Sequence, residues 1–436
     1  MFVTFSFKKT NYRIIQSQSF QFPNMFKVKQ IFPRPTVNNL RDAVKEELEK
    51  FCPSSIKGKR IAITAGSRDI KNIAEIIQTI GVVLKGKGAL PFVVNAMGSH
   101  GGASAQGQRK VLSEYGIVEK MIKMPVCCSM QTVQIGCVNK EIPVFFDKFA
   151  MNADGVIVCG RVKPHTDFHA EIESGICKMM AIGLGKHKGA STIHQQGIHN
   201  FEWLIPEVAS LVIKQTPILG AIAIVENAYH DTARIVGWEP EAIIEEEKRL
   251  LMESKKLMAQ IYCKEFDVLI IDEIGKDISG AGMDPNIVGR SCTGMPGFDS
   301  IKASSIVVLG LSKKTGGHAT GIGMADVTTL KVANKIDFGK LYTNSITSVC
   351  PMGGKLPIIL NNDRDAILFS IKAANAVPTD QAKVIHIKNT SDIEKIEVSE
   401  SLLQHVEDSE NLKLLSSGKR MKFDEKMQLI SFDDFE

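Results

Sequence analysis

The chain has 436 residues, of which 44% are hydrophobic and 23% charged, a composition typical of a globular protein with two or three domains. No apolar run approaches the roughly 18 residues that a membrane-spanning helix needs, so a spanning protein is excluded. The net charge of +5 arises near the start, where residues 1–41 carry seven Lys or Arg and no acidic residue. Subtracting these seven leaves −2 for residues 42–436, which argues against a nucleic-acid-binding protein.

Residues 1–24 are cationic and acid-free but lack the apolar segment of a secretory signal. We interpret them as a disordered or targeting extension, or as sequence upstream of a start at Met25. The nine cysteines are scattered and form no C-x-x-C pair, which favours reduced thiols inside the cell over a disulfide framework. A cytoplasmic protein is therefore expected, with import into an organelle as the alternative if the extension is a presequence.

Apolar strands alternate with helices from about residue 38 onward. The strands are predicted at 59–66, 91–98, 153–160, 218–227, 266–275, 304–311, 355–360 and 382–387. The clearest helices are predicted at 201–215, 239–260 and 363–376. Continuous apolar strands that alternate with helices indicate parallel sheets covered on both faces.

The expected fold class is therefore α/β, with two α/β domains built on mainly parallel sheets and a crevice between them. An N-terminal domain is expected over residues 25–260 and a C-terminal domain over residues 261–420. Residues 421–436, rich in Lys, Asp and Glu, are expected to form a tail.

Histidines point to the chemistry, because five of the ten fall between residues 165 and 199. His100 and His165 each follow a predicted strand, and Arg68 follows another. Ligands of open α/β sheets bind beyond the carboxyl ends of the strands, so these three side chains could face one crevice. A guanidinium with two imidazoles suits a small carboxylate substrate that undergoes proton transfer.

Each of these features also has a plainer interpretation. A histidine after a strand is often a turn residue, and an isolated arginine usually forms an ion pair at the surface. His165 and His169 have the spacing of a metal pair on one helix face, although no H-E-x-x-H glutamate lies between them. The segment 186–189 could bind phosphate or form a solvated loop. The residues alone thus indicate a small-molecule enzyme with a His-rich crevice.

Four short motifs in this region resemble those of the nickel-dependent lactate racemase family. They are MGSHGG with His100, VKPHTDFH with His165, SGICKM with Lys178 and STIHQQG with His194. Arg68 in AGSRD matches the arginine that holds the substrate carboxylate in that family. The order and spacing of these residues agree with the family pattern over about residues 38–420, most closely over 59–197.

The resemblance implies a racemase or epimerase that inverts C2 of a 2-hydroxy acid. The implied cofactor is a nickel pincer nucleotide (nickel-pyridinium bisthiocarboxylic acid mononucleotide), with His194 as the nickel ligand and Lys178 as its anchor. His100 and His165 would exchange protons with the substrate hydroxyl while a hydride passes to and from the cofactor. Arg68 would bind the substrate carboxylate.

The chain departs from the lactate-specific pattern at several positions. His165 and Lys178 are 13 residues apart, about three more than in the family, and Ala65 occupies a position that is often acidic. Asn286 and Arg290 lie near the positions of a substrate-side Gln and Lys, so Arg290 is a second candidate for substrate binding. These departures favour a 2-hydroxy acid other than lactate.

Two other functions stay open at this point. One is a divalent-metal (zinc) hydrolase or lyase that uses the same histidines, and the other is a binding protein for the cofactor or a hydroxy acid. The partner expected is a small-molecule 2-hydroxy acid, with no nucleic acid and no membrane, and assembly into a homo-oligomer is left open.

Overall fold

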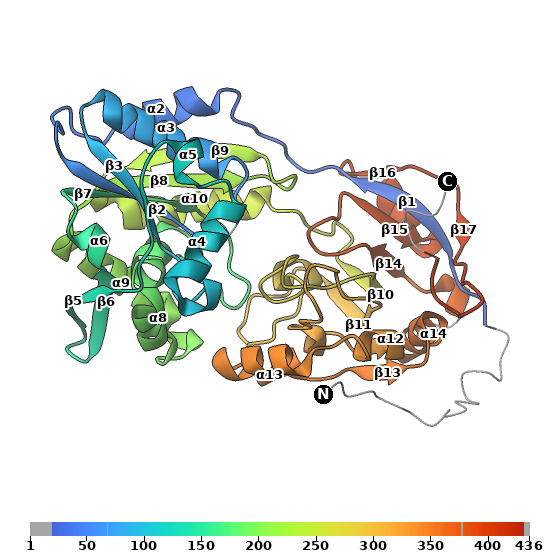
Figure 1. Ribbon diagram of the computed structural model, residues 1–436. Coiled ribbons are helices and arrows are strands. Elements are labelled where there is room, and N and C mark those ends of the chain that lie inside the picture. The colour runs from blue at the N-terminus through green and yellow to red at the C-terminus, as the bar shows by residue number, and fades with distance from the viewer. Residues whose placement is uncertain (1–19, 68, 376–377, 431–436) are drawn as a thin grey trace. The chain divides into compact units, whose positions relative to one another are not determined.

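The computed structural model describes residues 20–67, 69–375 and 378–430 (Figure 1). These residues form two units. The first unit is Pro33–Met258, and the second combines the described residues before Pro33 with those from Ala259 onward. Both contain helices packed on a sheet that includes a run of parallel strands, which confirms the α/β fold class.

The sheet of the first unit has the strand order β4-β3-β2-β7-β8-β9. Its strands are β2 (Arg60–Ala65), β3 (Leu90–Asn95), β4 (Val126–Cys127), β7 (Gly155–Arg161), β8 (Ile218–Glu226) and β9 (Thr232–Trp238). All neighbours are parallel except β8 and β9, which are antiparallel. A separate antiparallel pair is formed by β5 (Thr132–Val138) and β6 (Ile142–Asp147).

Helices cover both faces of this sheet, because alternate residues of each strand point to opposite sides. Ile61 and Ile63 of β2 belong to the core beneath α2 (Leu40–Glu49) and α3 (Ile73–Gly86). Thr64 points to the other face, where its hydroxyl donates to Met179 Sδ at 3.0 Å. The longer remaining helices of the unit are α4 (Ala105–Glu114), α8 (Lys186–His194), α9 (Phe201–Gln215) and α10 (Ile243–Leu257). Shorter ones are α5 (Glu119–Ile122), α6 (Lys148–Met151), α7 (Ile176–Lys178) and the π-helical η2 (Met179–Gly183).

The second unit contains a larger mixed sheet in the order β13-β12-β11-β10-β14-β15-β1-β16, with β17 also paired to β1. Its parallel part is β10 (Glu265–Ile271), β11 (Lys302–Val308), β12 (Val327–Thr329), β13 (Ile358–Leu360) and β14 (Val384–Ile387). Its antiparallel part is β1 (Asn24–Gln30), β15 (Lys395–Ser399), β16 (Leu412–Leu414) and β17 (Lys419–Arg420). Its helices are α11 (Pro285–Val288), α12 (Leu330–Ala333), α13 (Phe338–Thr347), α14 (Asp363–Ala373) and α15 (Leu403–Glu407).

Three segments differ from what the sequence indicates. Residues 25–32 were expected in the N-terminal domain, but β1 pairs along its length with β15 and so belongs to the second unit. Of the predicted N-terminal extension, residues 1–19 lie outside the described residues, whereas Phe22 is buried and packs on Phe423, with ring centroids 4.9 Å apart. Within the predicted tail, Leu429 N–H donates to Asp363 at 3.0 Å. The described part of that tail is therefore packed, and residues 431–436 lie outside the described residues.

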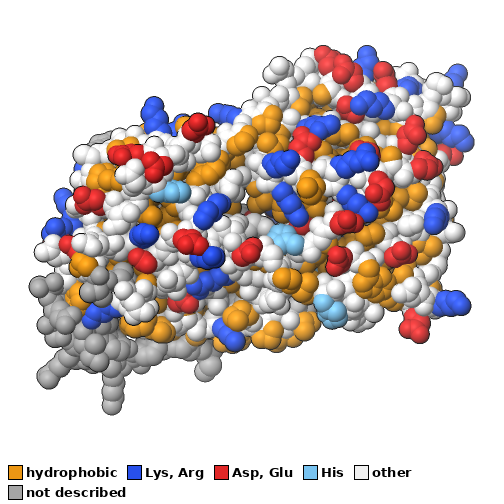
Figure 2. Space-filling model, turned by 180° about the vertical axis from the view of Figure 1, so that it is seen from behind, with side chains coloured by type: hydrophobic (Ala, Val, Ile, Leu, Met, Phe, Trp, Pro, Cys, Tyr) orange, Lys and Arg blue, Asp and Glu red, His pale blue; other side chains and the backbone are white. Residues whose placement is uncertain are grey.

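The surface mixes both signs of charge. Figure 2 shows basic and acidic side chains interspersed on the face that it presents, with hydrophobic side chains between them. No helix within the described residues is long and apolar enough to cross a membrane.

Candidate functional site

The site is built at the carboxyl edge of the first-unit sheet. Strands β3, β2 and β7 are adjacent and parallel, so the segments that follow them begin at the same edge. These segments carry His100 after β3, Ser67 after β2 and His165 after β7. Ser67 Oγ is hydrogen-bonded to His100 Nδ1, which joins two of the three segments directly. Arg68, predicted to bind the substrate carboxylate, lies outside the described residues.

A tight turn places His100. Gly98, Gly101 and Gly102 adopt positive φ angles of 56°, 63° and 65°, a region that favours glycine. A Cβ at Gly101 would lie 2.7 Å from the backbone nitrogen of Gln108, so the turn also needs the space that glycine leaves. The buried Gln108 side chain donates to the carbonyls of Gly98 and His100, at 3.0 and 2.9 Å. The backbone of His100 is therefore held from α4.

A fully buried ion pair is linked to this turn by hydrogen bonds through Asn95 and Gln108. Lys186 Nζ lies 2.7 Å from Asp147 Oδ2, and neither side chain is exposed. Lys186 also donates to the carbonyl of Asn95, whose side chain donates to Gln108. Burial lowers the pKa of Lys186, and the Asp147 carboxylate opposes this effect. Residues 186–189 thus begin α8, and the expectation of a phosphate-binding or solvated loop is wrong because Lys186 is enclosed.

The second histidine is held by a buried carboxylate. Glu173 accepts hydrogen bonds from the backbone N–H of His165 at 2.6 Å and from His169 Nδ1 at 3.1 Å. Lys255 completes an ion pair with the same carboxylate at 2.6 Å. Burial raises the pKa of Glu173, but the hydrogen bonds from His169, Lys255 and His165 outweigh it, so the pKa is lowered overall. His169 therefore faces Glu173, and residues 162–175 are not helical, so His165 and His169 do not share a helix face.

The ring of His165 contacts Lys178. Its Nε2 is hydrogen-bonded to Lys178 Nζ, and its Nδ1 accepts the backbone N–H of Asp167 at 3.0 Å. The imidazole of His165 and the amino group of Lys178 are therefore hydrogen-bonded to each other. The arrangement places an acid–base group beside a lysine side chain.

Helix α10 anchors the segment that carries both groups. Ser254 Oγ donates to the carbonyl of Val162 at 3.0 Å, near the start of the segment. Glu247, fully buried, accepts the N–H of Cys177 at 2.8 Å, directly before Lys178. Burial raises the pKa of Glu247 to about 7. The Glu247 carboxylate occupies the space that a Cβ would take at Gly175, so this glycine is needed for the close approach of α10.

Replacing Gly175 by Ala is expected to destabilise the first unit by about 1–3 kcal/mol, because the new Cβ must displace a buried, hydrogen-bonded carboxylate. Both tryptophans of the chain, Trp203 and Trp238, lie in this unit, so urea unfolding followed by tryptophan fluorescence measures it. The control is Gly86→Ala at the end of α3, where a Cβ meets nothing within 4 Å. It should be neutral or stabilising by up to about 1 kcal/mol. Equal midpoints for the two variants would contradict the proposed clash.

His194, the predicted nickel ligand, ends α8. Its ring packs on Phe201 with centroids 5.2 Å apart. Desolvation and the nearby charge of Lys178 lower the pKa of His194, which favours the neutral imidazole that a metal ligand must be. The turn before His100 is joined to η2, which follows Lys178, because Gly98 N–H donates to the carbonyl of Gly183 at 3.2 Å. Within the part of the chain that the structure describes, no group of three His, Cys, Asp or Glu could hold a metal ion.

Arg290 lies in the second unit, where its guanidinium makes structural contacts. It forms an ion pair with Asp326 at 2.6 Å and donates to the carbonyls of Met324 and Ala303, at 3.2 and 3.0 Å. Asn286 donates to Asp284 at the start of α11. Substrate binding by Arg290 stays a prediction. A bound carboxylate would compete with Asp326 and the two carbonyls for the guanidinium.

The residues that support the site were not among those predicted from the sequence: Ser67, Gln108, Lys186 and Glu247. Glu247 had a usable signal, because it lies four residues after Ile243 and three before Leu250, on the buried stripe of α10. Its two acidic neighbours, Glu245 and Glu246, made the segment resemble a solvated helix start. Ser67 and Lys186 gave no such signal, since their partners lie 33 or more residues away in the sequence, and Gln108 is a polar residue with no pattern that marks it as buried.

Comparisons with known proteins found little sequence similarity. No protein-family model matches the chain, and no curated protein sequence matches it. Among solved structures, the lactate racemase apoprotein from Thermoanaerobacterium thermosaccharolyticum is similar to 84% of this chain and 89% of that chain, with 12% identity and a TM-score of 0.47. A likeness of this size does not determine a shared activity.

Proposed function

We propose that the protein is a 2-hydroxy acid racemase or epimerase that works with a nickel pincer nucleotide. The observation that carries the proposal is the contact between His165 and Lys178, with His194 near enough for the charge of Lys178 to lower its pKa. Three of the residues that the motifs single out thus lie together, although 13 and 16 residues separate them in sequence.

The residues present fit such a cofactor. A pincer nucleotide brings its own carbon and sulfur donors, so it needs one ligand from the protein, and the neutral imidazole of His194 suits nickel. Lys178 could hold the nucleotide through a covalent link or a hydrogen bond. The described residues contain no group of three metal-ligating side chains, so the zinc hydrolase alternative gains no support from them.

When bound, the cofactor would accept a hydride from the substrate and return it. As an imidazolium, His165 would donate a proton from Nε2 to the substrate oxygen, and Asp167 Oδ2, 3.8 Å from Nδ1, would stabilise that charged ring. His100 would exchange a proton with the substrate hydroxyl on the opposite face of the reacting carbon. If its Nδ1 donates to Ser67, its Nε2 can accept the hydroxyl proton. Arg68 is assigned to the substrate carboxylate.

The test is inversion of a panel of 2-hydroxy acids, measured by chiral chromatography on protein co-produced with cofactor-synthesis enzymes. His100→Ala and His165→Ala should each reduce the rate by about 10²–10⁴-fold while nickel is retained. His194→Ala should lose the nickel. The control, His405→Ala on the exposed end of α15, should change neither.

Nickel-loaded protein that inverts no member of the panel would favour the binding-protein alternative. Stoichiometric zinc without nickel would overturn the proposal in favour of a metal hydrolase or lyase. Full activity in either catalytic variant would overturn the scheme with two acid–base histidines.

A further inference from the structure

Two cysteines of the second unit lie side by side, although they are 58 positions apart in the sequence. Cys292 follows α11, and Cys350 lies between α13 and η6 (Pro351–Gly354). The Cys350 thiol donates to the carbonyl of Cys292 at 3.1 Å. A Cβ placed on Gly353 would lie 3.6 Å from Cys292 Sγ and 3.8 Å from Cys350 Sγ, so both sulfur atoms border the same small space. The two side chains therefore meet, as the formation of a disulfide requires.

The backbone around the pair combines a held segment with an irregular one. Cys350 N–H donates to the carbonyl of Ser345 at 2.9 Å, and the carbonyl of Gly353 accepts the N–H of Gly321 at 3.0 Å, so the segment of Cys350 is held on both sides. Cys292 lies in residues 289–301, which contain no helix or strand. In that segment a Cβ on Gly294 would meet nothing within 4 Å. A small movement of this segment can therefore bring the two sulfur atoms to the bonding distance of about 2.0 Å while the sheet stays in place.

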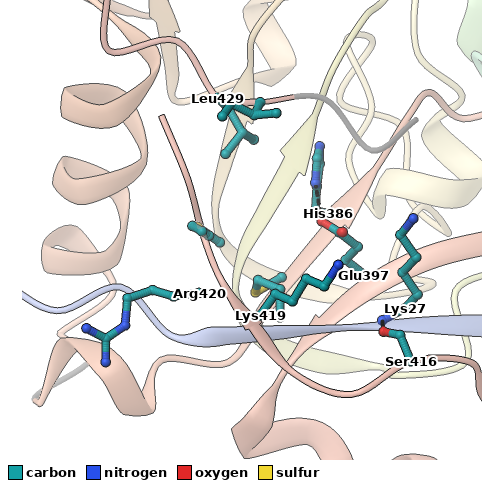
Figure 3. A pocket seen from close by; sticks show the side chains of 10 residues that line it. Lys27, His386, Glu397, Ser416, Lys419, Arg420 and Leu429 are labelled. Atoms are coloured by element: carbon teal, nitrogen blue, oxygen red, sulfur yellow. Dashed lines mark hydrogen bonds and ion pairs between the residues drawn. The ribbon is translucent and has the colours of Figure 1, made fainter. Parts of the chain in front are cut away.

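A small reactant can reach the pair, because both side chains are partly exposed. Cys159 and Cys263 differ in this respect, since burial raises their pKa values to about 12 and about 11. Such thiols are poor nucleophiles at neutral pH, because the thiolate is the reactive form. The pair is also distinct from the cavity of this unit that Figure 3 shows, which is lined from β1, β14, β15 and the segment 416–430 and has no cysteine in its lining.

We propose that Cys292 and Cys350 form a reversible dithiol–disulfide site whose reactant is a small-molecule disulfide such as glutathione disulfide. The thiolate of one cysteine attacks a sulfur of glutathione disulfide, which forms a protein–glutathione disulfide and releases one glutathione thiolate. The thiolate of the other cysteine attacks the protein sulfur of that bond, which forms the Cys292–Cys350 disulfide and releases the second glutathione. The protein loses two electrons and two protons, and glutathione disulfide is reduced to two glutathione molecules.

The bond would close a loop that contains β11, β12, α12 and α13. Closing a loop restricts the unfolded chain, so the oxidised second unit is harder to unfold than the reduced one. Disulfides of this reversible kind usually sense the redox state of a reducing compartment. The site uses none of the histidines or lysines assigned to the racemase reaction, so failure of one proposal leaves the other standing.

The experiment is incubation of the full chain in glutathione buffers of increasing disulfide content, followed by alkylation, tryptic digestion without reduction and mass spectrometry. Trypsin releases the two cysteines in separate peptides, residues 291–302 and 341–355, neither of which contains another cysteine. These two peptides joined together are expected as the main oxidised product, and dithiothreitol should separate them. In Cys292→Ser the second exchange step is blocked, so Cys350 should carry glutathione at least about tenfold more often than in the wild type. Cys137→Ser is the matched control, because Cys137 is exposed on β5 of the first unit and its loss should leave the cross-link unchanged.

Differential scanning calorimetry provides a second measurement. The oxidised wild type should unfold about 5 °C or more above the reduced protein, whereas Cys292→Ser treated in the same way should show no such rise. The proposal is overturned if the joined peptides are absent while Cys137 acquires glutathione, since the reactant was then active. It is also overturned if Cys350 carries as much glutathione in the wild type as in Cys292→Ser, or if Cys350 pairs with a cysteine other than Cys292. An unchanged transition temperature would overturn the constraint on unfolding.

Discussion

Replacing Lys186 by Met is expected to destabilise the first unit by about 3–5 kcal/mol, because it leaves the carboxylate of Asp147 buried without its partner. The substitution also removes the donor to the carbonyl of Asn95, which belongs to the network beneath the His100 turn. Urea unfolding followed by tryptophan fluorescence measures the effect, since Trp203 and Trp238 both report on this unit.

Two further variants make this result specific to the ion pair. Lys186→Met combined with Asp147→Asn should recover part of the lost stability, because no uncompensated charge is then buried and the amide oxygen can still accept from the N–H of Ala150. Lys110→Met on the exposed side of α4 should stay within about 0.5 kcal/mol of the wild type. A Lys186→Met protein that loses less than about 1 kcal/mol would show that the pair does not support the first unit.

The second unit is expected to lose stability as the pH rises from about 6.5 to 10. The pKa of His386 is raised from its ordinary value of 6.5 to about 10 in the folded chain by Asp272 and Glu397, which outweigh burial. The folded state then binds a proton that the unfolded state releases, so the stabilisation is fully present below pH 6.5 and disappears through pH 10. At 1.36 kcal/mol per pKa unit, the contribution is at most about 5 kcal/mol.

Differential scanning calorimetry between pH 6 and pH 10 measures this dependence as a falling transition temperature. His386→Gln provides the comparison, because its side chain is uncharged in this range and still hydrogen-bonds. That variant should be less stable at pH 6 and should lose most of the pH dependence. Identical slopes for the variant and the wild type would assign the dependence to other groups.

The sequence was informative wherever a local pattern reflects burial. Strands β2, β3, β7 and β8 were predicted because both faces of a central parallel strand are buried, which produces a continuous apolar run. The same apolar runs predicted that His100 and His165 come directly after strands. Strand β1 was assigned to the wrong unit, because pairing Met25–Lys29 with Lys395–Ser399 joins residues about 370 positions apart and no local pattern encodes such a partner.

The sequence by itself thus determined the α/β class, the order of the main strands and the edge of the sheet at which His100 and His165 stand. Only the tertiary structure decided which charged side chains are buried. Lys186, Glu247 and His386 look like ordinary polar residues in the sequence, and each is enclosed because a distant partner compensates or hydrogen-bonds it. A buried charge is tolerated only with such a partner, and the partner is supplied by packing between elements that are remote in the chain.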